Sequence, residues 1–265
     1  MRLSAYIGGI GVLGPGLANW PQTAAVLSGK RPYLPAPTVL PVPAMLPPAE
    51  RRRTGRVVKL ALAVALEASS SADADPAQMP SVFSSSGSDG HICHEICQAL
   101  ALSTREVSPT RFSNSVHNVA AGYWSIATGS MAAANVLCAF DASFVAGLLE
   151  ALTQATVDRE SVLLVAYDTE YPPPLHAKRP IPDALGVAMV LAPERSPSSI
   201  ASIALTLTDE SYDKMSDPTL ETLRGAIPAA RSLPLLRLLA IGARGRAILD
   251  YLDVTRAAVQ VEPCS

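Results

Sequence analysis

A strand–helix–strand unit within residues 133–168 constrains the fold more than any other segment of the sequence. Residues 133–140 (AANVLCAF) form a short apolar run suited to a buried strand, and residues 161–168 (SVLLVAYD) form a second such run. Between them, residues 141–143 make a tight junction into FVAGLLEALTQAT, where apolar residues recur at helical spacing. Such a unit builds parallel sheets with crossover helices, so the sequence predicts an α/β fold with a mixed or mainly parallel sheet.

The remaining elements follow from the same kind of pattern, and they indicate one domain over residues 1–265. Residues 32–48 hold seven prolines, which lack the amide donor and fix φ, so we expect an extended or looping arm there. Strands are expected at 5–13, in the stretch 80–90, at 185–193, 198–208 and 257–263, and helices at about 48–68, 91–102, 116–129 and 232–252.

Composition excludes several classes of protein. With 49% hydrophobic and 17% charged residues, the 265-residue chain can bury a substantial core. A net charge of -2 argues against a nucleic-acid binder, and the longest apolar stretches are too short to span a membrane. The N-terminus lacks the pattern of a signal peptide, and four cysteines do not make a disulfide framework. We therefore expect a cytoplasmic protein of bacterial type.

Several stretches resemble, in order, the N-terminal half of the β-ketoacyl synthases. They are YIGGIGVLGPG, RRRTGRVVKLALAVALEA, FSNSVHNVAAGYWSIATG, ANVLCAFDASFVAGLLEAL, VLLVAYD and LGVAMVLAPE. The resemblance covers roughly residues 5–195 and implies a thiolase-like fold, layered α-β-α-β-α, that is truncated in its C-terminal half. The segment SVHNVAAGYWSI resembles the corresponding part of short synthase-like proteins of aryl polyene and similar type II polyketide systems.

The chain departs from that family where the chemistry would be. A condensing synthase has a cysteine at the strand-to-helix elbow, where the helix N-terminus lowers the pKa of the thiol. Counting back from VLLVAYD puts the elbow at Ala142, flanked by Asp141 and Ser143, with Cys138 four residues earlier in the strand, pointing into packing. The family also needs two downstream histidines, and only His176 follows the elbow.

The resemblance and these departures together imply a chain length factor, a non-catalytic synthase homologue without cofactor. Such a subunit forms a heterodimer with an active ketosynthase and shapes its acyl tunnel in polyketide or fatty-acid-type biosynthesis. The small apolar strand 133–140 is the expected pairing edge. Tunnel or interface residues are then Val136, Cys138, Phe140, Tyr123 and Trp124, although core packing also accounts for Tyr123 and Trp124.

Arginines near the start of the helix at 48–68 suggest a contact with acidic acyl carrier protein. They are Arg51, Arg52, Arg53 and Arg56, followed by Lys59. Cations at a helix start oppose the macrodipole, which hints at a use, but a solvated helix face explains them as well.

Two rival interpretations stay open at this point. Ser143 would be a nucleophile if His117 or His176 served as its base, or it would cap the following helix. A stand-alone acyl-binding or partner-binding role is the further alternative. The cluster His91–Cys97 contains zinc-ligating residue types, yet no second ligand pair accompanies it, so we expect no metal and two half-buried cysteines on a helix.

Overall fold

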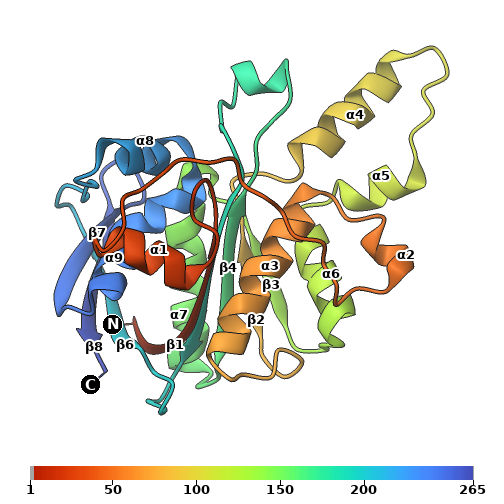
Figure 1. The fold of residues 1–265 in the computed structure, drawn as a ribbon. Coiled ribbons are helices and arrows are strands. Elements are labelled where there is room, and N and C mark those ends of the chain that lie inside the picture. The colour runs from red at the N-terminus through yellow and green to blue at the C-terminus, as the bar shows by residue number, and fades with distance from the viewer. Residues whose placement is uncertain (1–2, 265) are drawn as a thin grey trace.

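The computed structural model describes residues 3–264, and within them the strands form one eight-stranded mixed sheet. Its order is β3-β2-β4-β5-β1-β6-β8-β7 (Figure 1). The strands are β1 (Leu3–Leu13), β2 (Ser81–Ser84), β3 (Ala134–Leu137), β4 (Val162–Asp168), β5 (Leu185–Ala192), β6 (Ala201–Thr208), β7 (Gly245–Asp250) and β8 (Arg256–Pro263). Only β2 pairs in parallel, with β3 and with β4, and the other pairings are antiparallel. The predicted α/β class with a mixed sheet is confirmed.

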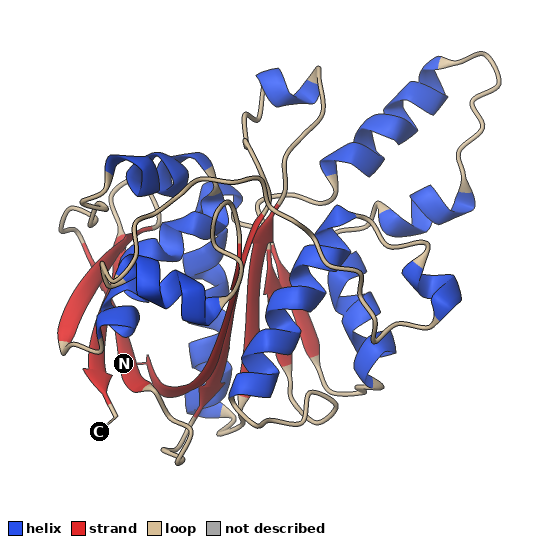
Figure 2. Ribbon diagram, in the orientation of Figure 1, coloured by secondary structure: helices blue, strands red, loops and turns tan. Residues whose placement is uncertain are grey.

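Helices cover both faces of this sheet (Figure 2). The α-helices are α1 (Trp20–Leu27), α2 (Pro48–Arg51), α3 (Arg56–Ser71), α4 (Gly90–Ala101), α5 (Pro109–Asn114), α6 (Val119–Thr128), α7 (Ser143–Val157), α8 (Pro218–Ala226) and α9 (Leu233–Ile241). Short 3-10 turns are η1 (Phe140–Ala142), η2 (Leu175–Ala177) and η3 (Pro228–Ser232). Helices α3 and α6 pack on one face, α7 and η3 pack on the other, and α9 lies against β7 and β8.

The central strand β4 shows why the sequence requires two helical layers. All seven of its residues are buried, and the six that precede Asp168 alternate between two separate hydrophobic clusters. Leu164 faces the cluster that contains α7, whereas Leu163 and Val165 face the cluster that contains α3. A continuous apolar strand of this kind is typical of a sheet buried on both sides.

Two glycines let α3 lie unusually close to β1. A Cβ atom on Gly9 would overlap the carbonyl oxygen of Ala68, and one on Gly11 would overlap that of Val64. Both carbonyls belong to α3, so a residue with any side chain at these positions would push the helix away from the sheet.

Two predicted helices differ from the structure. The helix expected at 48–68 is split, because α2 ends at Arg51 and α3 begins at Arg56. The helix expected at 232–252 ends at Gly242, which adopts the left-handed conformation, and the chain then continues as β7. Glycine at that position is a common helix stop, and this signal outweighs the apolar run that follows it.

Candidate functional site

The sharp turn after β3 is centred on Phe140. This residue has φ of 52°, in the left-handed region that bulky side chains rarely adopt, whereas Ala142 has an ordinary φ of -88°. The sequence predicted the strand-to-helix elbow at Ala142. In the structure the strained residue of the elbow is instead Phe140. Strain at such a position persists only where surrounding contacts hold it.

Ser143, the first residue of α7, supplies some of those contacts. Its hydroxyl accepts a hydrogen bond from the Ala139 amide (3.0 Å) and donates one to the Phe140 carbonyl (2.7 Å). The hydroxyl of Ser84, at the end of β2, donates to the Ser143 carbonyl. Ser143 is buried, and it binds backward to the turn instead of capping the amides of α7. Its hydroxyl is thus occupied in holding the elbow, with neither His117 nor His176 bound to it.

Asp141 lies in a network of ion pairs around the same turn. Its carboxylate is 2.5 Å from Arg179 and 3.3 Å from Arg231, and Arg231 also lies 3.0 Å from Asp250 at the end of β7. The Arg179 guanidinium stacks over the Phe140 ring, 4.0 Å from its centroid. These contacts neutralise the charge next to the elbow and place a cation over one face of the Phe140 ring, which otherwise stays exposed.

A buried carboxylate stands beside the elbow at the end of β4. Asp168 accepts hydrogen bonds from the Ser86 amide (2.9 Å), the Ser86 hydroxyl (2.5 Å) and the Ala229 amide (2.9 Å). Complete burial raises the pKa of Asp168 to about 6, and the three hydrogen bonds oppose that rise. The sequence analysis did not single out Asp168, although an acidic residue that ends a fully apolar strand was a usable signal.

Strand β3 is an edge strand, and it is not buried in this chain. Ala134 and Asn135 are exposed, and Val136 and Leu137 are only partly buried. Cys138 follows the strand and is exposed, with its thiol 3.5 Å from the Ser86 carbonyl. The predictions of a buried strand and of a thiol that points into packing are wrong, because β3 has a neighbour on one side only.

The large aromatic residues of α6 lie in the core. Trp124 and Tyr123 are buried in the cluster formed with α3, and the Tyr123 hydroxyl is 3.4 Å from Asn114. Phe140, in contrast, exposes 62% of its surface. Of the five residues predicted to line a tunnel or interface, Val136, Cys138 and Phe140 are therefore the ones near the free edge.

The predicted carrier-protein arginines divide into two groups. Arg51 donates to the carbonyls of Ala44 and Leu46, and Arg56 forms an ion pair with Glu170 at 2.6 Å. Arg52 and Arg53 are exposed, and Arg53 pairs with Glu50.

The cysteines of α4 do not form a metal centre in this structure. Cys93 and Cys97 are exposed, not half-buried as predicted, because α4 projects from the body of the molecule (Figure 1). His91 lies 3.6 Å from Glu170. Among residues 3–264, no group of three or more His, Cys, Asp or Glu side chains is placed to hold a metal ion. None of the helices in the same range combines the length and apolar character needed to cross a bilayer.

Comparison with known proteins places this geometry in context. The family profile for the N-terminal domain of β-ketoacyl synthases matches residues 19–243. No curated protein matches the chain. Solved structures do match it, among them a ketosynthase (ApeO) in complex with its chain length factor (ApeC) from Xenorhabdus doucetiae. That match has 23% identity and a TM-score of 0.73, and it covers 97% of this chain and 99% of the other.

Two further complexes have similar folds. The ishigamide ketosynthase/chain length factor matches with 13% identity and a TM-score of 0.72, covering 99% of this chain and 100% of that one. The type II polyketide synthase complex AntDE:AntF, an acyl-carrier protein with its hexaketide-bound ketosynthase, matches with 11% identity and a TM-score of 0.78 over 100% of both chains. At these identities the likeness shows the fold, and the predicted thiolase-like fold is confirmed.

Proposed function

The chain belongs to the family of β-ketoacyl synthase N-terminal domains, and from this premise we propose that it is a chain length factor type of subunit. It pairs with an active ketosynthase and helps to shape the acyl tunnel at their shared interface. The product class is a polyketide or fatty-acid-type chain, as in aryl polyene biosynthesis, and the acyl chain arrives on an acyl carrier protein.

The observation that carries this proposal is the elbow itself. The strained position that follows β3 holds Phe140, whose side chain has no nucleophilic atom, and Asp141 beside it is held by two arginines. A condensing enzyme needs an activated thiol at such a turn. Cys138 is two residues away, outside the turn and before the start of α7, so its thiol lacks the helix N-terminus that would activate it.

The free edge of the sheet supports pairing with another protein. Apolar side chains near β3 are exposed, including Met131 (96%), Phe140 (62%) and Ile126 (53%). Exposed large apolar side chains at both ends of an edge strand are what a pairing surface would present, and obligate interfaces often bury about 2,000 Å² or more. The matched structures include complexes between ketosynthases and chain length factors, which agrees with such a partner.

Of the four arginines predicted to contact the acyl carrier protein, the proposal keeps Arg52 and Arg53. Both side chains are exposed near α2, where an acidic protein could reach them, and of the two Arg53 pairs with Glu50. Arg51 and Arg56 are less exposed, and they bind the Leu46 carbonyl and Glu170. Catalysis by Ser143 receives no support from the geometry, since its hydroxyl is buried and bound to the backbone of the turn.

Co-expression with an active ketosynthase from the same genome tests the proposal. We expect the two chains to elute as one heterodimer in size-exclusion chromatography, and we expect the complex, but not this chain alone, to join acyl and malonyl groups presented on carrier protein. The Cys138→Ser variant of the complex should keep its activity. Carbon–carbon bond formation by the purified single chain, or failure of the two wild-type chains to associate, contradicts the proposal.

A further inference from the structure

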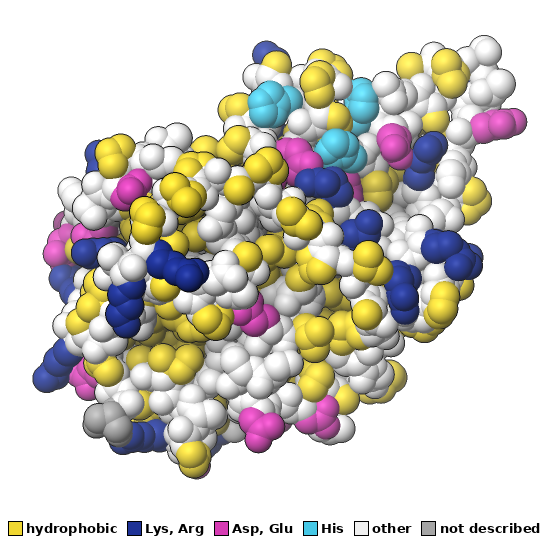
Figure 3. All heavy atoms as spheres, in the orientation of Figure 1, with side chains coloured by type: hydrophobic (Ala, Val, Ile, Leu, Met, Phe, Trp, Pro, Cys, Tyr) yellow, Lys and Arg dark blue, Asp and Glu magenta, His cyan; other side chains and the backbone are white. Residues whose placement is uncertain are grey.

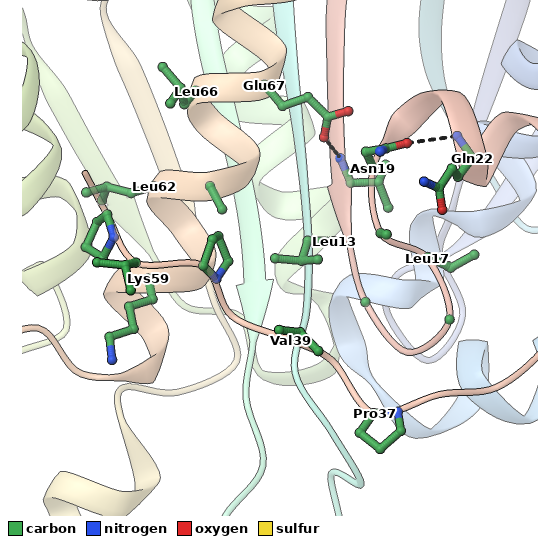
Figure 4. A pocket seen from close by; sticks show the side chains of 18 of the residues that line it. Leu13, Leu17, Asn19, Gln22, Pro37, Val39, Lys59, Leu62, Leu66 and Glu67 are labelled. Atoms are coloured by element: carbon green, nitrogen blue, oxygen red, sulfur yellow. Dashed lines mark hydrogen bonds between the residues drawn. The ribbon is translucent and has the colours of Figure 1, made fainter. Parts of the chain in front are cut away.

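A cavity of about 780 Å³ lies between α3, the end of β1 and the proline-rich arm, away from the elbow. Its volume is within the range of about 300–1,000 Å³ that is typical of small-ligand sites. Figure 4 shows α3 on one side, the turn that follows β1 on the other and the arm crossing between them. The apolar lining includes Leu13, Leu17, Val39, Val42, Leu62 and Leu66.

The lining side chains select for the shape of the ligand. Within the described residues, the cavity is lined by aliphatic and polar side chains and by no Phe, Tyr or Trp. It therefore offers no aromatic surface on which a flat ring would stack. A flexible aliphatic chain fits such a lining best, because it needs only apolar contact.

Several of the lining residues are exposed. Val39 exposes 80% of its surface, Leu34 exposes 71% and Val42 exposes 67%. Figure 3 shows hydrophobic side chains gathered along the path of the arm on this face. Covering them would release about 25 cal/mol per Å² of apolar surface, so the cavity favours an apolar occupant.

The backbone of the arm makes a bound peptide a poor occupant. Three of the lining positions from 34 to 45 are prolines, which have no amide donor, and the Ala36 carbonyl already accepts from the Gly16 amide (2.9 Å). The Thr38 amide donates to Asp183 (2.9 Å). An extended peptide would find few free backbone groups with which to pair.

The charged residues of the lining determine the polar end of the ligand. Glu67 is occupied, because its two oxygens accept from the amides of Val12 (2.9 Å) and Trp20 (2.6 Å). Lys59 lies two helical turns earlier on the same side of α3 and forms no ion pair within residues 3–264. Glu67 keeps its negative charge but its oxygens are already hydrogen-bonded, so the group of the lining that is free to form an ion pair is the Lys59 ammonium, which attracts an anion.

We propose that this cavity binds a straight-chain aliphatic carboxylate. The chain lies along Leu62, Leu66 and the apolar side chains of the arm, and the carboxylate pairs with Lys59. The site is separate from β3 and the elbow, so this inference does not rest on the proposed pairing with a ketosynthase and is tested on the chain by itself.

Isothermal titration of the purified chain with dodecanoate, below its micelle concentration, tests the site. We expect saturable binding, and we expect dodecylamine to bind at least about fivefold more weakly than dodecanoate, since the ammonium would repel it. Lys59→Met should weaken dodecanoate binding by about fivefold and leave dodecanol binding unchanged. Val39→Asp, which places a charge in the apolar lining, should weaken the binding of both ligands by about tenfold or more.

Val254→Asp is the matched control, because Val254 is equally exposed (80%) and does not line the cavity. It should bind dodecanoate like the wild type. An absence of saturable binding, or equal affinity for dodecanoate in wild type and Val39→Asp, overturns the proposal. Dodecylamine binding as tightly as dodecanoate overturns the assignment of a carboxylate. If the wild type self-associates in sedimentation and Val39→Asp does not, the face is an interface between copies and the proposal is wrong.

Discussion

The two edges of the sheet, β3 and β7, differ in how they are protected. The β7 edge carries charged residues, with Arg246 paired to Glu210 at 2.7 Å. It is also covered by the loop between β6 and α8, because the Ile248 amide donates to the Asp213 carboxylate (2.8 Å) and the Asp213 amide donates to the Ile248 carbonyl (2.8 Å). Strand β3 has the sequence ANVL, without charge or proline, and no further strand beside it among residues 3–264.

Proteins commonly protect exposed strand edges with charges, covering loops or distortions, since a bare edge pairs with other chains. Strand β7 has two of these features, charged residues and a covering loop, and β3 has neither. The contrast indicates that β7 is protected against pairing with another strand, whereas β3 is free to pair.

The largest expected effect comes from blocking the β3 edge without disturbing the rest of the sheet. The amides of Ser81 and Ser85 donate to the carbonyls of Ala133 and Leu137, so by alternation the backbone groups of Ala134 point away from β2. Ala134→Pro removes an outward amide and should abolish association with the ketosynthase in size-exclusion chromatography. Val136→Asp, which adds a charge to the same strand, should do likewise.

The matched control is Arg246→Pro on β7, where alternation from Ile248 also directs the amide outward. It should leave the complex intact. Circular dichroism must show both proline variants to be folded. If a folded Ala134→Pro chain still associates, or if Arg246→Pro prevents association as well, β3 is not the specific pairing edge.

A smaller effect concerns Asp168, which lies between the two edges and fixes η3 through the Ala229 amide. Its pKa is raised to about 6 by burial, from an ordinary value of 3.8, so the folded chain holds this proton more tightly than the unfolded chain does. The contribution of this group to stability therefore falls as the pH rises from about 4 to about 6 and is constant above that. At about 1.4 kcal/mol per pKa unit, the fall is about 2–3 kcal/mol.

Urea unfolding at several pH values, compared between wild type and Asp168→Asn, isolates this contribution from that of other carboxylates. The difference in unfolding free energy between the two proteins should change by about 2–3 kcal/mol between pH 4 and pH 6. A difference that is constant over this range would show that Asp168 keeps an ordinary pKa.

The smallest effect tests the link between the edges. Arg231 pairs with Asp141, in the turn that follows β3, and with Asp250, which ends β7, so one guanidinium connects the segments next to the two edge strands. Arg231→Met should lower the unfolding free energy by about 1–2 kcal/mol, because both carboxylates are partly buried and each keeps a second arginine.

Arg244→Met removes an exposed pair with Glu262 and should change stability by about 0.5 kcal/mol or less. Thermal unfolding of the two variants compares the pairs directly. Equal losses in both variants would mean that Arg231 acts as an ordinary surface charge.

The sequence predicted those parts of the fold where local pattern and packing agree. The strand–helix–strand unit, the opening strand and the two strands expected at 185–193 and 198–208 are present, as α7 with its flanking strands, β1, β5 and β6. The end of helix α9 at Gly242 was not predicted, because the apolar residues on both sides of this glycine fit one continuous helix.

The candidate site was harder to predict because its contacts are long-range. The absence of a cysteine at the elbow was evident from the sequence, but the position of the turn at Phe140 depends on backbone geometry that no local pattern encodes. Arg179 and Arg231 reach Asp141 from segments about 40 and 90 residues away, and nothing in their sequence surroundings connects them. The sequence predicted that Ser143 flanks the elbow, but its hydrogen bonds to the preceding residues could be found only from the fold.

The glycine pair of β1 has a consequence for how this chain tolerates change over evolution. Gly9 and Gly11 determine how closely α3 approaches the sheet, and α3 forms one wall of the cavity that contains Lys59. An alanine at either position would move that wall, although no side chain that lines the cavity would be changed. The width of the cavity in natural homologues should therefore depend on the residues at these two positions. Glycine should be retained wherever that width is under selection.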